Sequence, residues 1–115
     1  MNDHPHRGDI YWVDFHPGRG SEQLGRRPAL IIQNDVGNKY AATTIIAAVS
    51  TSLHPSPTNV IISPDKSNGL KQRSCVKLSQ LLTIDQSRLF KKLGCLSKTQ
   101  IEQVDAALRL SLNLE

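Results

Sequence analysis

The chain has 115 residues, of which 38% are hydrophobic and 21% charged, and its formal net charge is +4. This length suits one domain, and the composition is that of a globular protein rather than a disordered one. The longest apolar run, residues 45–49, is too short to cross a bilayer, and no signal peptide precedes it. These features predict a cytoplasmic protein.

The basic charge is concentrated in one part of the sequence. Residues 65–98 carry eight Lys and Arg against two Asp, a net charge of +6, whereas residues 41–64 carry no charged side chain. Such a stretch suggests a polyanionic partner, either nucleic acid or an acidic peptide. On charge alone, an ordinary solvated face explains it equally well.

The N-terminal half predicts short strands separated by loops. We expect a flexible N-terminal arm over residues 1–6 and a single domain over residues 7–115. The loop of residues 16–27 contains three glycines and is long for so small a domain, which is typical of functional loops. Polar residues 34–39 predict a turn. Aromatic, β-branched and continuous apolar residues predict strands over residues 10–15, 29–33 and 43–49.

The C-terminal half predicts further strands and one helix. Ser97 and Gln100 have capping-box spacing, and apolar residues recur at helical spacing after them. Residues 89–96 fit a helix or a strand, and residues 64–73 predict a polar turn. Further strands are predicted over residues 59–63, 75–78 and 80–84. The expected fold class is mainly β, with five to seven short antiparallel strands closed into a small barrel and a C-terminal helix packed on it.

Several common catalytic motifs are absent from the sequence. It contains no P-loop, GxGxxG, HExxH or GxSxG pattern, and its acids do not cluster with His at metal-ligand spacing. We therefore expect chemistry without a metal or a cofactor. The two cysteines, Cys75 and Cys95, are expected to be reduced and buried, with a disulfide or a reactive thiol as the alternative.

Residues near the ends of two predicted strands could bind a phosphate. Arg26 and Arg27 join the glycine-rich loop to a strand, and Pro28 restricts Arg27 to extended conformations. A guanidinium held in this way suits a phosphate, although a salt bridge to Glu22 is the alternative. The hydroxyls of residues 50–52 could bind a phosphate or start a turn.

Two histidines lie in predicted loops. His16 and His54 are residue types that serve as acid and base in RNA cleavage. Loop histidines are more often simply exposed to solvent, and both interpretations stay open.

Separated blocks of the sequence resemble the MazF/PemK toxin family of bacterial toxin–antitoxin pairs. These blocks are RGDIYWVDFHPGRGSEQLGRRPALIIQND, SCVKLSQLLTIDQSRLFKKLG and LSKTQIEQVDAALRLSL, and the resemblance covers residues 7–114. It implies a homodimeric SH3-like barrel of the PemK/CcdB type with a C-terminal helix. It also implies a metal-independent, sequence-specific endoribonuclease that cleaves single-stranded messenger RNA. A MazE-like antitoxin with a disordered acidic tail would inhibit it.

The resemblance assigns roles to particular residues. Arg27 precedes the proline of the second strand and matches the catalytic arginine. Ser50 stands where the family commonly has threonine, and the neighbouring Thr51 is an alternative source of the hydroxyl. Arg26 replaces a residue that is often apolar, and Gln80 matches a glutamine that contacts bases. The implied RNA-binding residues are Ser21, Glu22, Gln23, Arg26, Pro28, Thr51 and Gln80.

The implied reaction is attack of the substrate's 2′-OH on the adjacent phosphate, which gives a 2′,3′-cyclic phosphate and a 5′-OH. Arg27 would stabilise the developing charge and Ser50 would hold the phosphate; no general base is identified. Tyr11, Trp12 and Phe15 are expected in the core or a dimer contact rather than as base platforms.

Two other functions compete with this one. An inactive RNA-binding barrel would bind RNA without cutting it. A CcdB-like gyrase poison would carry an aromatic residue near its C-terminus, whereas this chain ends in LRLSLNLE.

Overall fold

The computed structural model describes residues 4–15 and 25–115. In this part of the chain, six antiparallel strands form one sheet in the order β4-β5-β3-β2-β1-β6. The strands are β1 (Asp9–Asp14), β2 (Arg26–Ile31), β3 (Thr43–Ser50), β4 (Asn59–Ile62), β5 (Ser74–Asp85) and β6 (Leu89–Cys95). The helices are α2 (Asp35–Tyr40), α3 (Lys98–Leu112) and the short 3-10 helix η1 (Gln86–Arg88).

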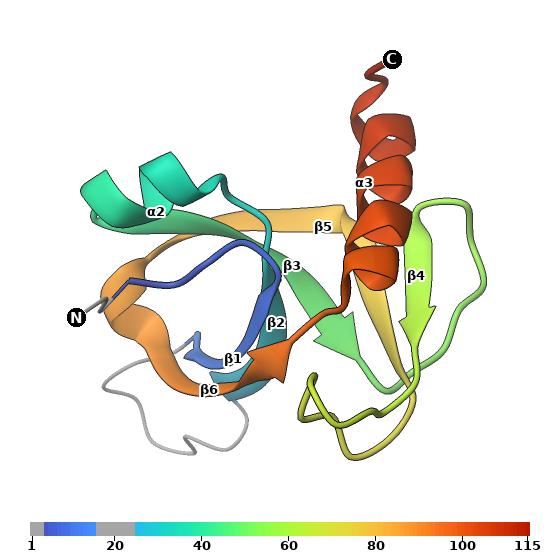
Figure 1. The fold of residues 1–115 in the computed structure, drawn as a ribbon, viewed down its shortest axis with the longest axis horizontal. Helices are drawn as coiled ribbons and strands as arrows, with labels where there is room; N and C mark the ends of the chain where they lie inside the picture. Colours follow the sequence, from blue (N-terminus) through green and yellow to red (C-terminus); the bar gives the residue numbers. More distant parts are fainter. Residues whose placement is uncertain (1–3, 16–24) are drawn as a thin grey trace.

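The predicted fold class, mainly β with a C-terminal helix, is confirmed. The sheet is strongly curled, and α3 stands against β4 and part of β5 while α2 lies against β3 (Figure 1). Within the described residues the edge strands β4 and β6 do not pair with each other, so the barrel stays open. The expectation of a closed barrel is corrected in that respect.

Apolar residues cover both faces of the central strands. Successive side chains of a strand point to opposite faces, so β2 sends Leu30 into one core cluster and Ala29 and Ile31 into another. The first cluster includes the buried face of α3, and the second includes Val13 and Ile84. Each fully buried Leu, Ile or Val contributes about 1.5–3 kcal/mol, which explains the continuous apolar runs of β2 and β3.

The capping box of α3 forms as predicted. The Ser97 hydroxyl accepts the Gln100 backbone N–H at 3.2 Å, and the Gln100 side-chain oxygen accepts the Ser97 N–H at 2.8 Å. Asn113 ends the helix in the left-handed conformation with φ 58°. The helix buries Val104, Ala107 and Leu108.

The turn expected over residues 34–39 is instead the helix α2. The Asn34 side chain accepts a backbone N–H of its first turn at 2.7 Å. The buried Asn38 accepts the Thr44 hydroxyl at 2.7 Å, and its carbonyl accepts the Gln86 side-chain N–H at 3.0 Å. Contacts with distant residues therefore stabilise a helix that local sequence does not predict.

Residues 64–73 form the predicted polar connection. Asp65 accepts backbone N–H groups from Asn68 at 2.9 Å and Ser67 at 2.8 Å, and the Gln100 side chain donates to it at 3.2 Å. These bonds, led by the one from Asn68, hold the pKa of Asp65 below its ordinary value. The carboxylate thus joins this connection to the start of α3.

Other predictions near the C-terminus are resolved or corrected. Residues 75–78 and 80–84, which predict one or two strands, belong to the single strand β5, and the ambiguous residues 89–96 are almost entirely strand. Cys75 is buried and free, but Cys95 is free and exposed. The expected burial of Cys95 is wrong because it ends β6, which is an edge strand of the sheet.

Part of the expected N-terminal arm contacts the domain. Pro5 is buried, and the His6 backbone N–H donates to the Asp9 carboxylate at 2.9 Å. Residues 1–3 lie outside the described residues. No helix in the described ranges is long and apolar enough to cross a membrane.

Gly94 provides a test of this packing. A Cβ atom there would overlap the backbone of Ser67 and Asn68, whereas one at Gly37 would meet only the flexible Gln33 side chain. Gly94→Ala is expected to lower the free energy of unfolding by about 1–3 kcal/mol. Gly37→Ala, in a helix, is expected to leave it unchanged or raise it by up to about 1 kcal/mol. Urea denaturation measures both, and equal effects would contradict this packing.

Candidate functional site

A surface pocket of about 440 Å³ lies where β2 begins and β3 ends. Its lining residues are Trp12, Arg26, Arg27, Pro28, Ala48, Val49, Ser50, Thr51, Lys77 and Gln80. We call this the central pocket. Every predicted site residue that the structure describes lines it. The predicted residues Ser21, Glu22 and Gln23, together with His16, lie outside the described residues.

The pairing of β2 with β3 brings Arg27 and Ser50 to the same pocket. Ala29 pairs with Ala48 in an antiparallel register, and this is the last pair of the two strands at this end. Arg27 lies two residues before Ala29 and Ser50 two residues after Ala48, and both line the central pocket. The Arg27 side chain is exposed and Ser50 is half-buried. A permanent cation and a hydroxyl therefore open onto one pocket.

Ser50 also shapes the chain beyond β3. Its hydroxyl oxygen accepts the Ser52 backbone N–H at 3.0 Å. The hydroxyl hydrogen is not used by that bond, so Ser50 starts a turn and can still donate to a ligand. Ser52 bonds the His54 ring at 3.0 Å, and His54 is not part of the central pocket.

A bulge in β5 brings Gln80 to the pocket. Ala47 pairs with Leu81 but Ala48 pairs with Lys77, so residues 78–80 have no partner on β3. Bulges of this kind redirect side chains and are common beside active sites. The exposed Gln80 lines the pocket, and its amide offers both donors and an acceptor.

Two further hollows adjoin the central pocket. One, of about 340 Å³, shares Trp12, Pro28 and Thr51 with it and adds Lys71 and Lys91. The other, of about 420 Å³, shares Trp12 and Arg26 with it. We call the three together the basic groove; its cations are Arg26, Arg27, Lys71, Lys77 and Lys91.

The basic groove is electrostatically one-sided. Its described lining contains no Asp, Glu or His. A cluster of cations attracts polyanions and raises their rate of association. No group of three or more His, Cys, Asp or Glu in residues 4–15 and 25–115 is placed to hold a metal ion. The arrangement fits the binding of a phosphate chain.

Sequence reasoning missed several residues of this groove. Lys71, Lys77 and Lys91 belong to the predicted basic stretch, but their common location depends on strand pairing. Trp12 was expected in the core or a dimer contact, yet it lines all three hollows. Tyr11 and Phe15 do pack against a core cluster.

Comparisons with known proteins identify the family of this chain. The family described as PemK-like, MazF-like toxin of type II toxin–antitoxin system matches residues 6–112. An endoribonuclease MazF of Staphylococcus epidermidis is 46% identical over 110 residues, which cover 94% of this chain and 91% of that protein.

Solved structures share the fold. An endoribonuclease in complex with its cognate antitoxin from a mycobacterial species aligns with a TM-score of 0.80 and 25% identity, over 96% of this chain and 97% of that one. In a MazE–MazF structure from Deinococcus radiodurans, a chain aligns with a TM-score of 0.77 and 21% identity, over 99% and 100%. The fold and the family match define a toxin of a type II toxin–antitoxin system. Within that class, the chain belongs to the PemK-like, MazF-like family.

Proposed function

We propose that this MazF-family endoribonuclease binds single-stranded RNA in the basic groove and cuts it without a metal. The observation that carries the proposal is the meeting of Arg27, Ser50 and Gln80 in one pocket lined by cations. Messenger RNA is the expected substrate, and the bacterial cytoplasm is the expected place of action.

The proposed step is a transesterification within the RNA. The 2′-oxygen forms a bond to the adjacent phosphorus while the bond from phosphorus to the 5′-oxygen breaks. The 2′-OH loses its proton and the departing 5′-oxygen gains one. The products are a 2′,3′-cyclic phosphate and a 5′-OH. DNA lacks the 2′-OH, so it binds in the groove without being cut.

Arg27 stabilises the charge that grows on the phosphate oxygens. Its guanidinium forms no ion pair or hydrogen bond with another described residue, and its side chain is exposed on the central pocket. An arginine stays protonated at neutral pH, which favours electrostatic stabilisation over proton transfer. The described pocket lining contains no carboxylate or imidazole, and we assign no general base.

Ser50 positions the phosphate, and Gln80 contributes to the selection of bases. The Ser50 hydroxyl donates to a phosphate oxygen and holds the phosphate in line with the attacking 2′-oxygen. The Gln80 amide reads a base edge, as side chains do with unstacked bases of single-stranded RNA.

Arg27→Ala tests the catalytic assignment. The loss of one such donor is expected to lower the cleavage rate about a hundred- to a thousandfold. The assay uses long single-stranded RNA with a chelator present, maps the cut positions and identifies the fragment ends. Arg109→Ala, a change on α3 far from the groove lining, serves as the control. Intact RNA with the unaltered protein, or full activity of Arg27→Ala, would contradict the proposal.

Single substitutions show whether the hydroxyl of Ser50 or that of Thr51 holds the phosphate. Ser50→Ala is expected to slow cleavage about tenfold to a hundredfold, because hydrogen bonds to charged groups contribute about 1.5–3 kcal/mol. Ser50→Thr keeps the hydroxyl and is expected to retain most of the activity. Initial rates on one mapped RNA site measure both. A larger loss in Thr51→Ala than in Ser50→Ala would transfer the role to Thr51.

A type II toxin has a protein antitoxin, and we propose that a small MazE-like antitoxin covers the basic groove with a disordered acidic tail. The charge of the groove supports this. Polyglutamate is expected to inhibit cleavage, and added salt to relieve the inhibition. Lys77→Ala should weaken the inhibition, and Lys98→Ala, outside the groove, should not. Inhibition that is equal in all three proteins would place the acidic partner elsewhere.

We propose that a second copy of the chain covers the outer end of α3. Leu110, Leu112 and Leu114 are 57%, 51% and 60% exposed there, beside a hollow of about 470 Å³ between α3 and β4. The uncharged residues 41–64 include β4, so a twofold interface would bury apolar surface. Leu110→Asp is expected to convert a dimer into a monomer in sedimentation experiments. A monomeric unaltered protein at micromolar concentration would refute the interface.

A further inference from the structure

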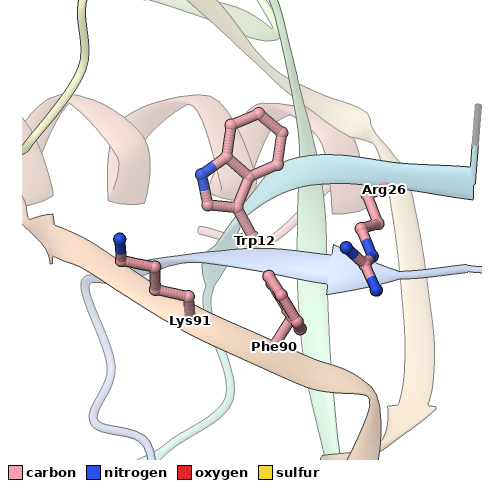
Figure 2. A pocket seen from close by; sticks show the side chains of 4 residues that line it. All are labelled: Trp12, Arg26, Phe90 and Lys91. Atoms are coloured by element: carbon pink, nitrogen blue, oxygen red, sulfur yellow. The ribbon is translucent and has the colours of Figure 1, made fainter. Parts of the chain in front are cut away.

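Beside the central pocket, four side chains from three strands line the hollow of about 420 Å³ (Figure 2). They are Trp12 on β1, Arg26 on β2, and Phe90 and Lys91 on β6. We call this the stacking pocket. The catalytic assignment uses none of these four residues, and only Arg26 was placed among the predicted RNA-binding residues. The aromatic side of this pocket therefore has no role so far.

A bulge holds Phe90 at the surface. Trp12 pairs with Lys91 but Val13 pairs with Leu89, so Phe90 has no partner on β1. Its side chain is 56% exposed. An exposed aromatic ring next to another aromatic residue and two cations is a feature of ligand sites rather than of a hydrophobic core.

Arg26 lies over this ring and forms no salt bridge with another described residue. Its guanidinium carbon is 4.1 Å from the centre of the Phe90 ring, and the two groups lie side by side in Figure 2. Its buried Nε has no hydrogen-bond partner among the described residues. Within the described part of the chain, the contact that positions this cation is therefore its cation–π contact with Phe90. Guanidinium planes and aromatic rings are the two platforms on which unpaired RNA bases stack.

We propose that the stacking pocket binds one nucleotide of the RNA outside the pair that is cut. Its base stacks against Arg26, Phe90 and Trp12, and Lys91 contacts its phosphate. Stacking accepts every base because every base has a π-face. The pocket therefore extends the length of RNA that the protein binds and raises its affinity for RNA. It does not require a particular base at that position. This inference rests on the proposed function, because it needs RNA in the neighbouring central pocket.

The first test extends a short RNA substrate stepwise at either end. Once an extension reaches the stacking pocket, KM is expected to fall about tenfold for the unaltered protein. Phe90→Ala, Phe90→Leu and Arg26→Ala should abolish the difference in KM between the long and the short RNA. Tyr40→Ala removes an exposed aromatic ring on α2 and Arg109→Ala an exposed cation on α3, and both should keep it.

The same series of substrates distinguishes the contribution of the base to KM from that of the phosphate. An abasic nucleotide at the position whose addition lowers KM should lower KM only slightly. An equal gain with the abasic nucleotide would refute stacking. A gain that survives in both Phe90 variants and in Arg26→Ala would refute the pocket itself.

A second test does not need cleavage. Trp12 is the one tryptophan of the chain and lines all three hollows, so its fluorescence reports on ligands in the groove, and Phe90→Leu isolates the stacking pocket. Oligodeoxyadenylate, which has no 2′-OH, is expected to quench it with saturation, and Phe90→Leu should raise the apparent Kd about tenfold. Tyr40→Ala should leave that Kd unchanged. If no RNA is cut but this pattern holds, the proposed function fails and the stacking pocket stands; an equal Kd in Phe90→Leu refutes the pocket.

Discussion

The antiparallel pairing of β2 with β3 is the constraint on which the other features of the site depend. The register joins Ala29 to Ala48 and Ile31 to Ile46 in the middle of the sheet. A shift of this register by one residue would turn every side chain of β2 to the opposite face of the sheet. Leu30 would then leave its core cluster, and Ala29 and Ile31 would leave theirs. The hydrophobic core therefore excludes such a shift, and the same register brings Arg27 and Ser50 to one pocket.

The strand pairings of β5 and β6 contribute to the groove in a different way, because both are interrupted near residues that line it. Residues 78–80 have no partner on β3, and Phe90 has none on β1. Leu93, unmatched between Gly94 and Lys92, lines the hollow next to the central pocket. Regular pairing thus builds most of the core, and the irregular positions Gln80, Phe90 and Leu93 add their side chains to the groove.

This division explains what the sequence could predict. Helix α3 was predictable because Ser97 and Gln100 cap it locally. The family resemblance singled out Arg27 and Ser50, and the structure places both on one pocket. The short helix α2 was not predictable, because the bonds that hold Asn38 come from Thr44 and Gln86. Trp12 and Lys77 were missed for a related reason: their common location depends on strand pairing, and no local pattern marks it.

The unmatched positions also affect how this fold can change over time. A residue without a ladder partner contributes little to strand pairing, and Gln80 and Phe90 are exposed as well. Substitutions there alter the wall of the groove at small cost in stability, whereas substitutions in the β2–β3 ladder disturb the core. The surface of the groove can therefore change while the sheet and its hydrophobic core stay the same.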